Sequence, residues 1–149
     1  MGSDGSMKDT HTILNEIIVA AKECGQVMLQ ADRNNFGIKD KAGKANFVTA
    51  YDCKIQEMLQ IRLSQILPEA EFLGEEEDCR IDRNAEYIFV VDPIDGTTNF
   101  IKDYHMSCVS VGLIRNGKRY LGVVHNPYLD ETFSAISGEG AYMNGNAIH

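Results

Sequence analysis

Two segments in the first half of the chain place apolar residues at the spacing of an amphipathic helix. Between Thr10 and about Ala31 they recur every three or four positions, with lysine and glutamate in the gaps. A second segment starts near Thr49 and stops at Pro68, which cannot continue a helix. Thr10 or Thr12 is expected to cap the first helix. The predicted core-facing residues are Ile13, Leu14, Ile17, Ile18, Ala21, Cys24 and Met28, then Tyr51, Ile55, Met58, Leu59, Leu63 and Ile66.

After Pro68 the pattern changes to short apolar or alternating runs, which indicate strands. These runs cover residues 71–73, 87–92, 108–114, 119–125 and 131–137, with turns at Asn116-Gly117 and Asn126-Pro127. Residues 37–46 and the glycine-rich residues 138–146 are expected to form loops or tight turns. Two helices followed by a meander predict an α+β fold, with two N-terminal helices packed on a mainly antiparallel sheet.

Composition narrows the classes of function. The chain has 149 residues and a net charge of −8, without the stripe of lysine and arginine that nucleic-acid binding requires. Its apolar runs are too short to cross a membrane. The four cysteines form no C-x-x-C pair, so neither a zinc site nor a disulfide framework is indicated. We expect a cytoplasmic protein with one domain over residues 7–149, preceded by an engineered leader at residues 1–6.

The stretch VVDPIDGTTNF, residues 90–100, carries the most specific chemistry. A buried strand is expected to end at Asp92, and Pro93 then turns the chain so that Asp95 returns to the same neighbourhood. Gly96 has no Cβ, so another atom can approach the backbone closely. The amide groups of the two following threonines suit an oxyanion if a helical turn begins there. The stretch therefore offers hard oxygen ligands beside an anion cradle.

Carboxylate oxygens favour Mg²⁺, Mn²⁺ or Ca²⁺ over zinc. The acidic triplet 75–77 follows the predicted strand 71–73, and if that strand neighbours 87–92, Glu75 reaches Asp92. Glu75, Asp92 and Asp95 together would repel a phosphate, whereas two Mg²⁺ ions reverse the sign of the charge. Alone, the triplet is typical of a solvated surface and the DPID sequence of a simple turn; their joint placement after two apolar strands favours a metal site.

The motifs GEE at 74–76 and DPIDGTTNF at 92–100, with FVTAYD at 47–52, GVVHNP at 122–127 and GEGAYMNG at 138–145, resemble the inositol monophosphatase family. Members of that family are Mg²⁺-dependent, lithium-sensitive phosphomonoesterases. The resemblance implies the N-terminal half of a layered αβαβα fold, two or three Mg²⁺ ions with Mn²⁺ as an alternative, and a small phosphorylated substrate. An isolated half would expose a sheet edge and core surface, so we expect a homo-oligomer (dimer) or association with the missing C-terminal portion.

The resemblance also implies roles for individual residues. Glu75, Asp92 and the Ile94 carbonyl would hold one metal ion, and Asp92 and Asp95 a second, with Glu76 just behind these ligands. Ile94 and Asp95 would also border the substrate. The mechanism would be in-line attack on phosphorus by a metal-activated water molecule.

The phosphate and the attacking water have their own implied residues. Gly96 and Thr97 would give backbone N–H groups to the phosphate, assisted by Thr98. Asp52 with Thr97, and Glu75 with its metal, would orient and activate the water molecule. These three side chains, Glu75, Thr97 and Asp52, are the implied catalytic residues.

The chain departs from the family pattern at its C-terminal end. Family members continue with a second portion that carries a W-D-x-x-x-G metal motif, and this sequence contains no tryptophan. We therefore expect an incomplete fragment, either a truncated piece or an isolated half, with a natural inactive short form as the third reading. The leading hypothesis is a phosphatase for inositol monophosphate or a related sugar phosphate. The alternative is a non-catalytic metal-binding or interaction module.

Overall fold

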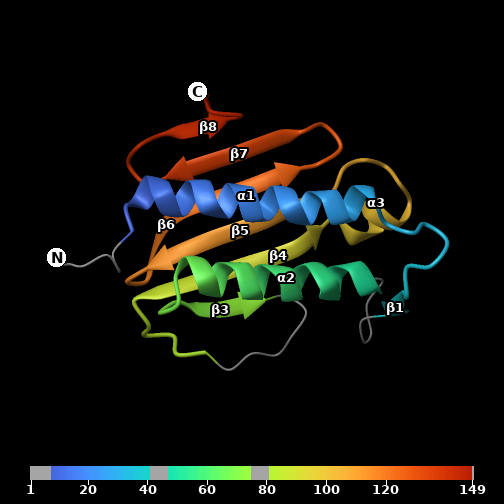
Figure 1. Ribbon diagram of the computed structural model, residues 1–149, viewed down its shortest axis with the longest axis horizontal. Coiled ribbons are helices and arrows are strands. Elements are labelled where there is room, and N and C mark those ends of the chain that lie inside the picture. Colours follow the sequence, from blue (N-terminus) through green and yellow to red (C-terminus); the bar gives the residue numbers. More distant parts are fainter. Residues whose placement is uncertain (1–7, 41–46, 75–80, 149) are drawn as a thin grey trace.

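A computed structural model describes residues 8–40, 47–74 and 81–148 of the chain (Figure 1). Its helices and strands alternate little: two long helices come first and most strands follow. The elements are α1 Thr10–Leu29, β1 Lys39–Asp40, β2 Phe47–Val48, α2 Ala50–Ile66, β3 Glu71–Gly74, β4 Tyr87–Asp95, α3 Thr97–Ile101, β5 Cys108–Arg115, β6 Lys118–Asn126, β7 Glu131–Ile136, β8 Ala141–Met143 and β9 Asn146–Ile148.

The main sheet has seven strands in the order β3-β4-β5-β6-β7-β8-β9. Strands β3 and β4 are parallel, and each later neighbouring pair is antiparallel. Strands β1 and β2 form a separate two-stranded sheet. The predicted α+β class, with two N-terminal helices on a mainly antiparallel sheet, is confirmed.

Both long helices begin at capping side chains. The Asp9 carboxylate accepts a hydrogen bond from the His11 amide at 3.2 Å and caps α1, so the expectation that Thr10 or Thr12 would do so is wrong. Thr49 caps α2 in a capping box with Asp52, and the helix ends before Pro68, as predicted. The capping box also fixes the Asp52 carboxylate at the start of α2, which matters for the site.

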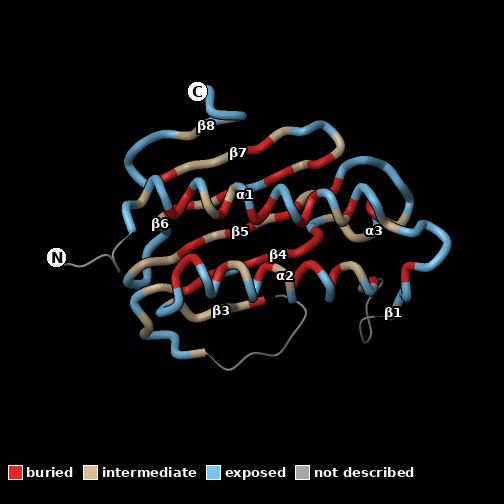
Figure 2. Tube along the Cα trace, viewed as in Figure 1, coloured by how far each residue is buried: buried red, intermediate tan, exposed pale blue. Residues whose placement is uncertain are grey.

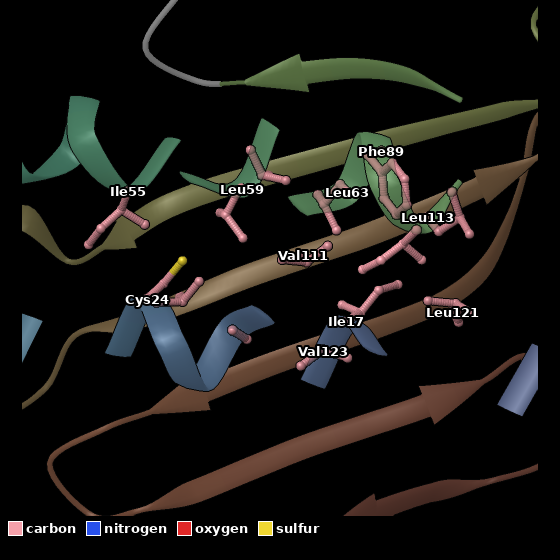
Figure 3. Close-up of a cluster of buried hydrophobic side chains, with 14 of the residues drawn as sticks. Ile17, Cys24, Ile55, Leu59, Leu63, Phe89, Val111, Leu113, Leu121 and Val123 are labelled. Carbon is pink, nitrogen blue, oxygen red and sulfur yellow. The ribbon is translucent and has the colours of Figure 1, made fainter. Parts of the chain in front are cut away.

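The core lies between the helix layer and one face of the sheet. Helices α1 and α2 lie side by side across this face (Figure 1), and the buried positions run along the facing sides of helices and strands (Figure 2). Apolar side chains from α1, α2, β4, β5 and β6 meet there (Figure 3). Fully burying one such side chain stabilises the fold by about 1.5–3 kcal/mol. Ile17, Ile55, Leu59 and Leu63 are all 0% exposed.

Three segments differ from the sequence-based prediction. The segment 37–46, expected to be loop or turn, contains strand β1 at Lys39–Asp40, because these residues pair with β2. Strand β4 does not stop at Asp92 but continues through Pro93 to Asp95, with a register shift against β5 between the two aspartates. A proline is tolerated in a strand at such a bulge because the hydrogen-bond ladder is already interrupted there. The glycine-rich residues 138–146 contain β8 and the start of β9 instead of only loop and turn.

The opposite face of the sheet is apolar and exposed among the described residues. Val90, Val124 and Phe133 point away from the core and are 37%, 37% and 38% exposed. Their sequence neighbours Val91 and Val123 belong to the core cluster, so the strands alternate between a covered and an open face. Within the described ranges, no helix is long and apolar enough to cross a membrane.

Candidate active site

Asp92 and Asp95 lie at the carboxyl end of β4. The parallel partner β3 ends at the same edge, because Gly74 pairs with Val91, the residue before Asp92. Against β5, Asp92 lies opposite Ser110 and Asp95 opposite Cys108. Asp92 is half-buried and Asp95 is exposed. The structure therefore brings the two aspartates to one end of the sheet. Strands β3 and β4 are neighbours, which is the condition on which the expected approach of Glu75 to Asp92 depends.

Gly96 makes the sharp turn that follows Asp95. Its backbone is left-handed, with φ 88° and ψ 47°, a conformation that side chains other than glycine rarely adopt. A Cβ atom at this position would lie 3.0 Å from the carbonyl oxygen of Met106. The turn leads directly into α3, so Thr97 and Thr98 stand in its first helical turn, where amide groups have no carbonyl partner within the helix.

Asp52 connects α2 to this turn. Its carboxylate is 0% exposed, and its Oδ2 accepts hydrogen bonds from the Thr49 amide at 2.8 Å and from the Thr49 hydroxyl at 2.5 Å. Its Oδ1 accepts a hydrogen bond from the Thr97 hydroxyl at 2.9 Å. The Thr97 hydroxyl also lies 3.1 Å from the Ile94 carbonyl oxygen. Because its proton is directed to these acceptors, a lone pair of the Thr97 oxygen remains for another donor.

The negative charges of Asp92 and Asp95 also act on the Cys108 thiol. Burial of the thiol, together with the negative charges of Asp95 and Asp92, raises the pKa of Cys108 to about 11. The thiol therefore stays protonated at neutral pH. No local signal in the sequence associates Cys108 with the site, since its place beside Asp95 depends on the pairing of β4 with β5.

The predicted residues Glu75 and Glu76 lie outside the described residues. The described strand end next to them is fixed by α2, because a Cβ atom on Gly74 would lie 2.5 Å from the side-chain amide of Gln56. In the ranges that the structure does describe, no group of three or more histidine, cysteine, aspartate or glutamate side chains is arranged to hold a metal ion. Three predicted site residues, Asp52, Ile94 and Thr97, are joined by hydrogen bonds.

Sequence reasoning missed the residues that support the turn from behind. Asn99 donates a side-chain hydrogen bond to the Met106 carbonyl at 3.2 Å. Arg33 donates hydrogen bonds to the carbonyl oxygens of Phe100 and Ile101. Thr49 had a detectable signal, since T-x-x-D at the start of a helix is a capping-box pattern. Arg33 had none, because its contacts are 67 and 68 residues away along the chain.

A helix layer on a mainly antiparallel sheet, with an acidic loop and a glycine turn at the sheet edge, defines an α+β protein with a candidate metal and phosphate site. A model of the inositol monophosphatase family matches residues 9–149. The chain belongs to the inositol monophosphatase family.

Individual relatives agree with this assignment. Inositol monophosphatase 2 of Solanum lycopersicum is 38% identical over 135 residues, which cover 88% of this chain and 51% of that protein. The structure of the extragenic suppressor protein suhB from Bartonella henselae matches with a TM-score of 0.87 and 32% identity, over 93% of this chain and 54% of that chain. An IMPase/NADP phosphatase complexed with NADP and Ca²⁺ matches with a TM-score of 0.87 and 28% identity, over 96% and 55%. The chain spans about half the length of these relatives.

Proposed function

We propose that the chain carries the metal- and phosphate-binding loop of a Mg²⁺-dependent phosphomonoesterase that hydrolyses inositol monophosphate or a related small sugar phosphate. The observation that carries this proposal is the hydrogen bond that joins the Asp92–Thr97 segment, at the junction of β4 and α3, to the buried Asp52 carboxylate in a member of the inositol monophosphatase family. A buried carboxylate that holds a threonine hydroxyl at the edge of an acidic loop is expensive to build. Three donors, the Thr49 amide and hydroxyl and the Thr97 hydroxyl, compensate this burial.

The donor atoms fit a hard cation. Asp92 and Asp95 offer carboxylate oxygens at one sheet edge, and Ile94 offers a carbonyl oxygen between them in sequence. We propose that these three residues and Glu75 hold two or three Mg²⁺ ions, with Mn²⁺ as an alternative, and that Glu76 supports the ligands. When bound, Mg²⁺ would supply Lewis-acid activation of the nucleophile and charge stabilisation of the leaving oxygen.

The Gly96 turn fits a phosphate oxygen. The missing side chain of Gly96 makes room for the Met106 carbonyl and allows the left-handed turn. The amide groups of Gly96 and Thr97, where α3 begins, would donate to the phosphate, with Thr98 assisting. Asp95, which is exposed, would border the same space, and Ile94 would do so only through its backbone, because its side chain lies in the core. Neutralisation of the aspartates is required first, because two carboxylates beside the turn repel an anion.

Asp52 and Thr97 would orient the attacking water molecule. The Thr97 hydroxyl proton is directed to Asp52, so its oxygen can accept a hydrogen bond from water and hold that water in a fixed direction. We propose that Glu75 is the other residue acting on this water molecule. Asp52 then acts as a buried orienting group, and its own position is fixed by the Thr49 capping box.

The relatives support the choice of substrate and inhibitor. The name of inositol monophosphatase 2 of Solanum lycopersicum states its substrate. The structure of a staphylococcal inositol monophosphatase-1 was solved as a LiCl-soaked inhibitory complex. We propose inositol 1-phosphate as the first substrate to test and lithium as an inhibitor. Fructose 1,6-bisphosphate, histidinol phosphate and phosphoadenosine phosphate form the comparison panel. Cys24 and Cys108, which form no disulfide, fit a cytoplasmic location.

A second candidate function is a non-catalytic metal-binding or interaction module. The open apolar face of the sheet favours it, because exposed apolar patches mark interaction surfaces. The partner would be a second copy of this chain, giving a homodimer, or a polypeptide equivalent to the unmatched half of the relatives.

The deciding experiment measures metal binding by calorimetry and phosphate release from inositol 1-phosphate with and without Mg²⁺. The phosphatase proposal expects Mg²⁺-stimulated release that Asp92→Asn abolishes and that the control Glu57→Gln, on the exposed side of α2, leaves unchanged. Mg²⁺ binding without turnover would support the module instead. Absence of Mg²⁺ binding by the wild-type chain would refute the phosphatase and the metal-binding module, and would leave only the interaction module.

A further inference from the structure

Arg33 lies just beyond the C-terminal end of α1 and reaches the end of α3. Its Nη2 atom donates hydrogen bonds to the carbonyl oxygens of Phe100 and Ile101, the latter at 3.0 Å. The Phe100 carbonyl also accepts a hydrogen bond from the Asp103 amide at 3.2 Å, so Arg33 adds a second donor there. A cation beside the last carbonyl groups of a helix is favourable for the helix dipole. Arg33 therefore closes the C-terminal end of the helix that begins at the Gly96 turn.

The guanidinium group is held by more than these hydrogen bonds. It lies over the ring of Phe36, 4.8 Å from the ring centroid, and over that of Phe100 at 5.5 Å. The two rings are themselves in edge contact, with centroids 5.2 Å apart. Arg33 also forms an ion pair with Asp103 at 3.7 Å. Lysine cannot reproduce a planar group that stacks and donates to two carbonyls together.

Helix α3 is short enough to transmit the position of one end to the other. It contains 5 residues, Thr97–Ile101, and spans roughly 7 Å at about 1.5 Å per residue. Asp52 holds its first residue through the Thr97 hydroxyl. Arg33 holds its last two residues through their carbonyl oxygens. A rotation of α3 at the Arg33 end would therefore move the Thr97 hydroxyl and amide.

The same arginine supports the loop that backs the Gly96 turn. Asp103, its ion-pair partner, also contacts His105 Nε2 at 3.0 Å. The His105 ring stacks on Tyr128 with centroids 4.7 Å apart and an angle of 6° between the planes. Both Asp103 and His105 have positive φ angles, 58° and 60°. This loop delivers the Met106 carbonyl to its place against Gly96.

We infer that Arg33 is a positioning residue for the phosphate-binding turn, acting through α3 and the loop 102–107. This inference rests on the proposed function for its readout in phosphate affinity. Arg33 lies outside the segment 92–97 and is not among the proposed metal or phosphate ligands. Loss of the two hydrogen bonds and of the ring stacking of Arg33 should increase the mobility of the backbone at 96–98. The positions of the aspartates and their affinity for metal should not change.

The test compares Arg33→Lys and Arg33→Met with the matched control Arg83→Lys, an exposed arginine between β3 and β4. Calorimetry measures Mg²⁺ binding first and then inorganic phosphate binding in saturating Mg²⁺. Both Arg33 variants should weaken phosphate binding by about tenfold, as expected when a hydrogen bond to a charged group is lost. Their Mg²⁺ affinity should be unchanged, a split that general destabilisation does not produce.

Amide hydrogen exchange without ligand provides a second readout, independent of the proposed function. Both Arg33 variants should lose protection in the peptide that contains residues 97–101, and Arg83→Lys should not. Unchanged protection there would overturn the inference, as would wild-type phosphate affinity in both variants. If the wild-type chain bound no phosphate but the Arg33 variants lost protection, the positioning role would stand and the proposed phosphatase function would fail.

Discussion

Replacing Thr97 by valine removes the hydroxyl group that donates a hydrogen bond to the buried Asp52 carboxylate, without changing the shape of the side chain. The lost interaction is the 2.9 Å hydrogen bond from Thr97 to Asp52, whose carboxylate is 0% exposed. A hydrogen bond to a charged group contributes about 1.5–3 kcal/mol to stability. Valine and threonine have similar helix propensities, so the change in α3 itself is small.

The expected result is a loss of about 1.5–3 kcal/mol in the free energy of unfolding. For a chain of this size each kcal/mol corresponds to roughly 2–4 °C in the melting temperature, so a shift of about 3–12 °C is expected. Urea unfolding at pH 7 gives the free energy directly. Asp52 keeps both Thr49 donors in the variant, so the fold should survive.

The matched control is Thr98→Val, the same substitution on the next residue, whose side chain is exposed. It should change stability by less than about 0.5 kcal/mol. A double-mutant cycle of Thr97→Val with Asp52→Asn should show a coupling energy of at least about 1 kcal/mol, because the two groups are in contact. Equal effects of the two valine substitutions would refute the hydrogen-bond argument.

Two further predictions concern the contact between α1 and β6. Gly25→Ala should destabilise the protein by about 1–3 kcal/mol in spite of its better helix propensity, because the new Cβ would lie 2.8 Å from His125 Cδ2 and 3.0 Å from Pro127 Cβ. Urea unfolding checks this against Gly112→Ala, whose Cβ would meet its nearest atom at an ordinary 3.7 Å, and a smaller loss in Gly25→Ala than in that control would contradict it. Burial lowers the pKa of His125 below its ordinary value of 6.5, so the unfolded state binds the proton more readily. Stability should therefore be complete above pH 6.5 and fall as the pH drops below it toward the folded pKa. Urea midpoints between pH 7.5 and pH 5 measure this fall, and an equally steep fall in His125→Gln would show that His125 is not its cause.

Sequence patterns predicted the helices and strands whose buried side carries apolar residues at a regular spacing. Ile13 and Ile17 mark one side of α1, and the apolar run before Asp92 marks β4, because burial selects the same spacing that a helix or strand imposes. Strand β8 was missed because its glycine-rich surroundings look like turn, whereas pairing with β7 decides its conformation. The continuation of β4 beyond Pro93 was missed for the same reason, because it depends on the pairing of Asp95 with Cys108 of β5.

The residues of the candidate site also fall into two groups, those recognisable from a local motif and those placed only by the fold. Asp92, Asp95 and Gly96 were found because their chemistry lies within a few residues of one another, and Asp52 entered only through the family resemblance. Arg33 has no local signature: its role comes from carbonyl groups 67 and 68 residues away that only the fold brings near. Residues that touch a ligand are often readable in a motif, whereas residues that hold the motif in place are set by tertiary packing.

The position of the acidic loop links the two candidate functions. Because strand residues alternate between faces, Asp92 shares the open face with Val90, while Val91 points into the core. Ser110, opposite Asp92, likewise alternates with the core residues Val109 and Val111. Any polypeptide that covers the open face therefore also forms a wall beside the proposed metal ligands. Metal binding needs only the carboxylates, but water exclusion and substrate selection need that wall. Covering the face should thus raise turnover more than it raises metal affinity.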